Sequence, residues 1–304
     1  MTLRGLIAAL VIWLGLAVPA LAADDQGQRI EVGHVQAAGL PEQRLTIWLP
    51  PGYATSQRRY GVVYMHDGHN LFDLTKSNFN KIWAADKAML AASRKGRFAP
   101  YIIVGIWAPG ADRYRQYLPK DIYDLASPAQ RERMDKLTGG PIVSDAYLAW
   151  LAGPLKHWVD QTYRTKPGPK DTAMVGSSMG GLMSCYAFLR RPDVYGRAAC
   201  VSSHGPAAEP GAPGAFDADL VARWDGWFKQ HLGKATGRRL WMDHGTATLD
   251  AWYAPYQQVI DARLAASGWQ RVRDWESKVY PGAEHEENAW AARLPEIFGW
   301  LLRH

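Results

Sequence analysis

Short apolar runs alternate with longer segments of helical periodicity along most of the chain. Short runs rich in Val, Ile, Leu and Met are typical of strands that a parallel sheet buries on both faces. The segments that we expect to form strands are 44–50, 61–66, 101–107, 172–176, 197–203, 238–244 and 273–282. Strands that alternate with helices predict an α/β protein with a mostly parallel central sheet and helices on both faces.

Apolar residues at helical spacing occupy the segments between these runs. The expected helices are 80–95, 144–164, 179–190, 217–231, 251–266 and 286–302. In the second of them, Tyr147, Leu151 and Leu155 recur at turn spacing, which predicts a stripe that faces the core. Segments 108–143 and 205–216 lack a steady period, and we expect them to be loops. Long loops of this fold class lie at the carboxyl ends of strands, where open α/β sheets bind ligands.

The N-terminal residues follow a different pattern. Arg4 precedes an apolar run over 6–18, and a small-x-small sequence follows at 20–22. This arrangement is typical of a secretory signal peptide, and the run is shorter than the roughly 20 apolar residues of a membrane span. We expect cleavage of residues 1–22, which leaves one domain at 23–304 in the periplasm or secreted, without stable membrane insertion. An uncleaved N-terminal anchor is the alternative.

Composition narrows the class of protein further. Hydrophobic residues make up 47% and charged residues 21% of the chain, which is typical of a globular domain and not of a disordered one. Two cysteines, Cys185 and Cys200, are too few for a small disulfide scaffold, and the sequence leaves their pairing open. The formal charge of +6 comes from scattered basic residues, so we expect no nucleic-acid partner. Nothing in the sequence indicates an oligomeric state.

The strongest chemical signal is Val-Gly-Ser-Ser-Met-Gly-Gly at 175–181. Gly176, Ser178 and Gly180 fit the motif G-x-S-x-G, with an apolar run before it and a helical segment after it. This context predicts a nucleophile elbow, a tight strand-to-helix turn that presents the serine. The N-terminus of the helix would stabilise negative charge that develops beside Ser178. A glycine–serine turn without chemistry is the alternative.

A serine nucleophile needs a base, and the base is oriented by an acid. In folds with this elbow, the acid and then the histidine follow the serine along the chain. His285 lies just beyond the last expected strand, where the base is expected. For the acid we predict Asp250, in the loop after strand 238–244, because the carboxylate normally comes from that loop. Asp243, at the end of the strand, is the alternative.

An oxyanion needs two N–H donors, which are expected from Met179 and from the loop His-Asp-Gly-His-Asn at 66–70. Gly68 would let the backbone approach the substrate carbonyl, so that Gly68 or His69 supplies the second donor. An ordinary turn, or a metal site that also uses His244, are the alternatives. The loop lacks the spacing of helical zinc motifs, and we expect no metal and no organic cofactor.

Several segments together resemble the putative-esterase family of α/β hydrolases, from about residue 40 to the C-terminus. They are YMHDGHNLFD (64–73), RYRQYLP (113–119), VGSSMGG (175–181), DHGTATLD (243–250) and GAEHEENAW (282–290). The resemblance implies an α/β-hydrolase fold and a serine esterase for siderophore, hydroxycinnamoyl or acetyl esters. It implies Ser178 as nucleophile, His285 as base and the region of Asp250 as acid. Many relatives carry the acid three residues after the loop glycine, where this chain has Thr248.

The substrate is expected to meet a basic, aromatic rim. Arg113, Arg115 and Tyr117 belong to the irregular segment 108–143, and His204 follows a strand. Such a rim suits an anionic aromatic ligand, such as a catecholate siderophore, and hydroxycinnamoyl esters of a glycan almost as well. The expected partner is therefore a small-molecule or glycan ester. The alternatives are that these side chains only anchor the loop, that the protein is an acyltransferase, or that it is a non-catalytic binding protein.

Overall fold

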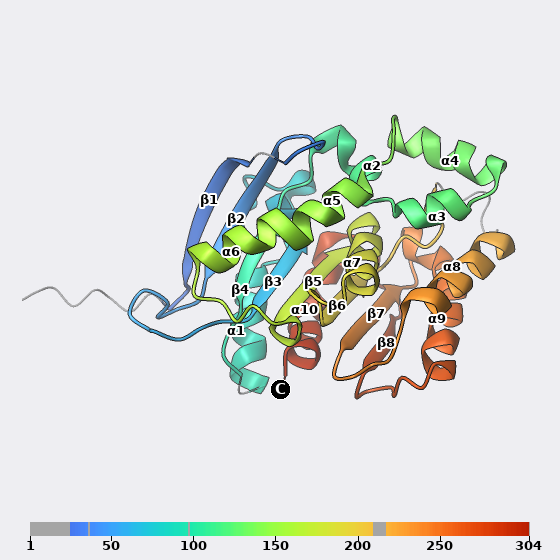
Figure 1. Ribbon diagram of the computed structural model, residues 1–304. Coiled ribbons are helices and arrows are strands. Elements are labelled where there is room, and N and C mark those ends of the chain that lie inside the picture. The colour runs from blue at the N-terminus through green and yellow to red at the C-terminus, as the bar shows by residue number, and fades with distance from the viewer. Residues whose placement is uncertain (1–24, 36, 97, 209–216, 304) are drawn as a thin grey trace, which may run out of the picture.

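A computed structural model describes residues 25–35, 37–96, 98–208 and 217–303. Eight strands form one sheet in the order β1-β2-β4-β3-β5-β6-β7-β8 (Figure 1). Their bounds are β1 Gln28–Val35, β2 Gln43–Leu49, β3 Val62–His66, β4 Ile102–Ile106, β5 Thr172–Ser177, β6 Arg197–Val201, β7 Arg239–Gly245 and β8 Trp275–Tyr280. β1 and β2 run antiparallel to their neighbours, and the strands from β4 to β8 are parallel. The predicted mostly parallel sheet is confirmed.

The edge strand β1 was not predicted from the sequence. Ile30 and Val32 alternate with polar residues in it, but Gly33 weakens the strand signal. β1 pairs only with β2, and the two share a register shift between Val32 and Val35. Its place in the sheet therefore depends on a partner strand rather than on its own pattern.

Helices cover both faces of the sheet, as the sequence predicts (Figure 1). One face packs against α1 (Ala85–Gly96) and α10 (Glu287–Leu301). The other packs against the helices α5 (Ser144–Trp150), α6 (Lys156–Thr162), α7 (Met179–Arg190), α8 (Ala218–His231) and α9 (Ala254–Ala266). Alternate residues of β3 serve the two cores: Val62 and Tyr64 face one, and Val63 and Met65 the other.

The predicted helix 144–164 is present but is not uniform. Between α5 and α6 the backbone forms a π-helix at Leu151–Leu155, which contains Pro154. Proline has no N–H to donate and disturbs the regular helical ladder, which accounts for a local change of hydrogen-bond pattern.

The prediction of an irregular segment at 108–143 is wrong. It contains three helices, α2 (Arg113–Tyr117), α3 (Lys120–Leu125) and α4 (Pro128–Thr138). The start of α4 has a sequence signal that was overlooked: Ser127 and Gln130 form a capping box around a proline at the first position. Figure 1 shows these helices grouped beside α5 and α8. They form a cap over the ligand-binding edge of the sheet, held in part by Asp121, which accepts a hydrogen bond from Trp227 (2.8 Å).

Other predictions meet the structure only in part. The predicted helix 80–95 begins at Ala85. Cys185 on α7 and Cys200 on β6 form a disulfide, which answers the question that the sequence left open. Residues 1–22 and most of the predicted loop 205–216 lie outside the described residues. Within the described ranges, no helix is both long and apolar enough to cross a membrane.

Candidate functional site

The site lies where the carboxyl ends of β3, β5, β6, β7 and β8 meet. Ser178 follows β5 directly and precedes the first residue of α7, with a φ of 56° and a ψ of −125°. A positive φ is strained for a residue with a side chain, and a nucleophile elbow uses that strain to present its serine. A hydrogen bond from the Ser178 N–H to the carbonyl of Val201 (3.0 Å) holds the turn.

The glycines of the motif allow the turn to close on itself. A Cβ atom on Gly176 would lie 2.6 Å from the carbonyl oxygen of Gly180. A Cβ on Gly180 would lie 3.0 Å from the Cβ of His66, and one on Gly181 would lie 2.7 Å from Ser203 Oγ. The glycines are therefore required by close contacts across the elbow and with the ends of β3 and β6.

The structure brings His285 and Asp250 together. His285 Nδ1 lies 2.6 Å from Asp250 Oδ1, and the Asp250 side chain is fully buried. Burial alone would raise the pKa of Asp250, but hydrogen bonds from His285, Ser202 and Gly245 lower it below its usual range. The N–H of His285 also donates to Thr248 Oγ1 (2.8 Å), so the position where many relatives carry the acid instead anchors the base loop.

Asp243, the alternative acid, lies elsewhere. Its carboxylate accepts hydrogen bonds from Trp241 Nε1 (2.6 Å) and from the N–H of Ser202 (3.2 Å), and it lies 3.1 Å from Arg293 Nη2. Burial raises its pKa despite the arginine. Of the two candidate aspartates, Asp250 is the one that contacts His285.

The loop after β3 is shaped to expose backbone N–H groups. Asp67 adopts the left-handed conformation (φ 55°), and a 3-10 helix begins at Gly68. The first N–H groups of a helix have no acceptor within it. The N–H groups of Gly68 and His69, and that of Met179 at the start of α7, hold such positions. The structure shows a packing reason for the glycine: a Cβ on Gly68 would lie 2.5 Å from the carbonyl carbon of Gly105 in β4. Gly68 lets the loop pack on the sheet.

Ser178 and His285 line a cavity of about 740 Å³. The other side chains around it come from the loop after β3, from the cap and from the start of α10. They include Asp67, His69, Asn70, Phe79, Lys81, Trp83, Arg113, Tyr114, Glu286, Glu287 and Trp290. The cavity is therefore mixed in character, with aromatic surfaces next to charged groups.

The charges around the cavity are paired. Arg113 makes two hydrogen bonds to Asp67, at 2.7 and 2.8 Å, and this contact lowers the pKa of Asp67 although burial opposes it. Lys81 lies 2.9 Å from a carboxylate oxygen of Glu286. Both lysine and arginine side chains among the described lining residues thus have a carboxylate partner. Glu287 is a third carboxylate in the lining.

Three residues predicted to contact substrate lie away from this cavity. Arg115 is held by Asp112 (2.9 Å) and the carbonyl of Pro141 (2.9 Å). Tyr117 is fully buried, with its ring 4.8 Å from that of His66. His204 is buried, and its two nitrogens contact Tyr253 Oη (2.7 Å) and the carbonyl of Ala208 (3.0 Å). Of the four predicted substrate contacts named above, Arg113 lines the cavity, and Tyr114 and Trp83 line it as well.

Several residues around the base carried no motif of their own in the sequence. The His285 ring is nearly perpendicular to the rings of Trp290 and Tyr253, with centroids 5.0 and 5.6 Å from its own. Glu287, in the first turn of α10, accepts a hydrogen bond from Asn70 (3.2 Å), and burial raises its pKa. The nearness of Glu287 and Trp290 to His285 in the sequence was the available signal.

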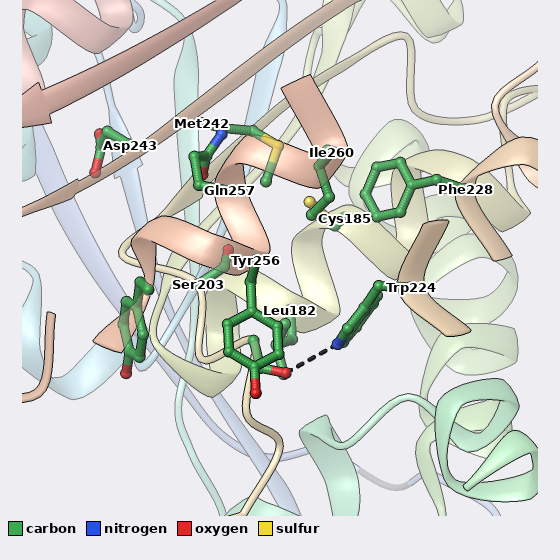
Figure 2. Close-up of a pocket in the computed structure, with 12 residues that line it drawn as sticks. Leu182, Cys185, Ser203, Trp224, Phe228, Met242, Asp243, Tyr256, Gln257 and Ile260 are labelled. Carbon is green, nitrogen blue, oxygen red and sulfur yellow. Dashed lines mark hydrogen bonds between the residues drawn. The ribbon is translucent and has the colours of Figure 1, made fainter. Parts of the chain in front are cut away.

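A second cavity lies within the protein, between α7, α8 and α9. Figure 2 shows its mostly apolar lining, with Leu182, Trp224, Phe228 and Ile260 around it and Ser203 at one side. Its volume is about 20 Å³, room for little more than one water-sized group. It is too small for an ester substrate. In the part of the chain that the structure describes, no group of three or more His, Cys, Asp or Glu side chains is arranged to hold a metal ion.

Comparison with protein families gives one match, to the family described as "Putative esterase", over residues 41–301. Among curated sequences, the chain is 25% identical over 160 residues to "Uncharacterized protein YbbA" of Bacillus subtilis (strain 168). That match covers 53% of this chain and 56% of the relative, so the chain spans little more than half of the relative's length.

Solved structures share the fold at low identity. A ferulic acid esterase superimposes with a TM-score of 0.64 at 15% identity, covering 91% of this chain and 99% of the other. An IroE-like serine hydrolase from Shewanella oneidensis gives 0.60 at 18% identity over 89% and 79% of the two chains. The enterobactin esterase FES from Shigella flexneri gives 0.58 at 13% identity over 89% and 59%. These likenesses confirm the predicted α/β-hydrolase fold.

Proposed function

This chain belongs to the putative esterase family, and we propose that it is a carboxylic ester hydrolase that acts through an acyl-enzyme on Ser178. The observation that carries the proposal is the convergence of three features at one edge of the sheet. Ser178 stands on a strained elbow, His285 lines the same cavity, and His285 is held at 2.6 Å by Asp250. This is the arrangement by which serine hydrolases activate their nucleophile.

In the proposed reaction, Ser178 Oγ attacks the ester carbonyl while His285 Nε2 takes its proton. The N–H groups of Met179 and of Gly68 or His69 bind the oxyanion; one such donor is worth roughly 3 kcal/mol to the transition state. His285 then protonates the leaving alcohol, and water, activated by the same nitrogen, releases the acid. Asp250 keeps the imidazole oriented and stabilises its charged form during both steps.

For the substrate, we propose an uncharged aromatic or acetyl ester of a hydroxyl-rich alcohol. The basic rim that would have favoured a ferric catecholate is neutralised: Arg113 is paired with Asp67 and Lys81 with Glu286. A polyanion would face Glu287 without an unpaired cation among the described lining residues. Phe79 and Tyr114 offer aromatic surface for a planar acyl group or a sugar ring. The carboxylates can accept hydrogen bonds from substrate hydroxyls, and the Asn70 amide can accept or donate them.

We also propose export to an oxidising compartment, with residues 1–22 removed. The signal-like N-terminus and the disulfide between Cys185 and Cys200 support it, because disulfides persist mainly outside the cytosol. Mass spectrometry of the protein from a bacterial periplasm should find Ala23 as its first residue. A full-length chain in the cytosolic fraction would contradict this part of the proposal.

The function is tested with p-nitrophenyl acetate and an active-site serine trap such as a fluorophosphonate. We expect turnover, a single adduct on Ser178 located by tandem mass spectrometry, and a loss of at least a thousandfold in kcat for Ser178→Ala. A variant that keeps its activity, or an adduct elsewhere, would overturn the mechanism. A panel of methyl ferulate, acetylated glycan and ferric catecholate esters then tests the substrate. Faster turnover of the catecholate would contradict the proposed class.

A further inference from the structure

Four buried residues lie behind Asp250, the acid of the site: Ser202, Gly245, Trp290 and Arg293. Asp250 Oδ1 binds His285, whereas Oδ2 accepts hydrogen bonds from Ser202 Oγ (2.6 Å) and from the N–H of Gly245 (2.5 Å). Ser202 Oγ in turn lies 2.6 Å from Arg293 Nη2 and 3.1 Å from Trp290 Nε1. None of these contacts was signalled by a sequence motif.

The donors around Ser202 fix the direction of its hydroxyl proton. Arginine and tryptophan nitrogens can only donate, so Ser202 Oγ accepts from both Arg293 and Trp290. The single proton of the Ser202 hydroxyl must then point to Asp250 Oδ2. Oδ2 thus accepts from Ser202 and Gly245, and these hydrogen bonds help to hold the pKa of Asp250 below its usual range. With Asp250 ionised, Oδ1 accepts from His285, whose proton then lies on Nδ1. His285 Nε2 is thereby left with its lone pair free, which is the state of a general base.

Arg293 brings one buried positive charge to this group. It is buried, with one contact of 3.1 Å to Asp243, while its Nε and Nη1 atoms have no hydrogen-bond partner among the described residues. Asp243 in turn fixes the Ser202 backbone, whose N–H lies 2.9 Å from the Asp243 carbonyl oxygen. Ser202 adopts a positive φ of 40°, a strained conformation that these contacts hold in place.

We infer that Ser202 and Arg293 are positioning residues, which fix the ionised form and orientation of Asp250 and, through it, the Nδ1-protonated tautomer of His285. This inference rests on the proposed function, because it assumes that His285 is the base. Without the Ser202 hydroxyl, Asp250 would lose one of the hydrogen bonds that lower its pKa, and it would take up a proton at a higher pH. The other charged or titratable groups around the pair are Asp243 on β7, His204 after β6, Tyr253 before α9, Arg113 in the cap, and Glu286 and Glu287 at the start of α10.

The test compares Ser202→Ala with Ser203→Ala. Ser203 is the adjacent serine, but its buried hydroxyl has no partner among the described residues and lines the small inner cavity (Figure 2). For Ser202→Ala we expect kcat for p-nitrophenyl acetate to fall about tenfold to a hundredfold with KM little changed. We also expect the acid limb of the kcat/KM profile to move up by about half a pH unit or more. Arg293→Met should move the limb in the same direction, and Arg293→Lys should move it less.

Ser203→Ala should retain the wild-type pH profile. If Ser202→Ala and Ser203→Ala give the same profile while Ser178 is still labelled by the trap, the inference is wrong and the proposed function stands. If Ser178 is not labelled in the wild type, the proposed function itself fails. A measurement on the unmodified protein covers the case in which the variants do not fold. Nitrogen-15 NMR of its histidines should show His285 protonated on Nδ1 above the acid limb, and protonation on Nε2 instead would overturn the inference.

Discussion

Two aspartate–arginine pairs flank the site, and they differ in what surrounds them. The front pair, Asp67 with Arg113, lines the cavity and is joined by two parallel hydrogen bonds. The rear pair, Asp243 with Arg293, is sealed in the core, and its arginine makes one contact to the carboxylate and another to Ser202. In front, the positive charge is neutralised where the substrate enters. In the rear pair, Arg293 also donates a hydrogen bond to Ser202, whose hydroxyl contacts Asp250.

An aspartate and an arginine therefore serve different purposes in the two pairs. A bidentate pair at a cavity wall shapes the loop and removes net charge from the surface that a ligand meets. A buried pair with unfilled donors costs desolvation energy, and so it contributes little stability by itself. It is retained, in our interpretation, because its geometry sets the proton positions of the acid and base.

The largest expected effect comes from breaking the rear pair. Asp243→Ala leaves Arg293 buried without its carboxylate, and should lower the free energy of unfolding by about 3–5 kcal/mol. Urea unfolding measures the change. The double variant Asp243→Leu with Arg293→Met, which removes both charges, should recover most of the loss. Asp67→Ala in the partly exposed front pair should cost less than half as much, and equal costs for the two pairs would contradict the comparison.

A smaller effect for each residue concerns two buried histidines, His66 beside the front pair and His204 near Asp250. Burial lowers the pKa of His66, near the front pair, to about 3, and that of His204, near Asp250, to about 4. In the unfolded chain a histidine takes up its proton near pH 6.5, which the folded protein resists. Stability is therefore complete above about pH 6.5 and should fall by roughly 1.4 kcal/mol per pH unit for each histidine as the pH decreases toward 4.

Urea unfolding between pH 7 and pH 5 checks this slope. The variants His66→Gln and His204→Gln cannot titrate, and each should flatten the slope by the share of one histidine. The difference in slope between wild type and variant gives the contribution of that histidine alone. Carboxylates such as Glu287 contribute equally to both proteins, and the raised pKa of Glu287 makes the free energy of unfolding increase as the pH falls. An unchanged slope in both variants would show that these imidazoles are not the groups that respond.

The smallest expected effect concerns charge selection at the cavity. Asp67→Asn keeps a residue that tolerates the left-handed conformation while it frees the charge of Arg113. The kcat/KM for the anionic p-nitrophenyl hemisuccinate, relative to neutral p-nitrophenyl valerate, should rise about fivefold, which corresponds to roughly 1 kcal/mol. Asp112→Asn, which frees Arg115 instead, is the matched control and should leave the ratio unchanged. A constant ratio in Asp67→Asn would mean that the pair does not govern selection.

Much of the site could be predicted from the sequence because it follows local rules. The elbow requires glycines within two residues of Ser178, and the base loop lies just before a helix with a recognisable start, so short segments were enough for both. The choice between Asp250 and Asp243 was harder. The two are seven residues apart, and only the direction of each side chain decides which one reaches His285.

The cap shows the opposite case. The segment 108–143 has little apolar periodicity, and α4 was missed although Ser127 and Gln130 carry a capping signal. Short helices gain little from their own sequence, and these are stabilised by packing on α5, α7 and α8. The rim residues Arg115 and Tyr117 were consequently assigned to the ligand, whereas the folded cap turns them to Asp112 and His66.

The sequence by itself determined the α/β alternation, the elbow at Ser178 and the place of His285, because each depends on residues close together in the chain. Only the tertiary structure decided the charge of the cavity and the support of the acid. Arg113 meets Asp67 across 46 positions, and Ser202 meets Arg293 across 91. Such contacts leave no local pattern, since a hydrogen bond depends on distances of a few tenths of an ångström that the packed sheet and helices set together.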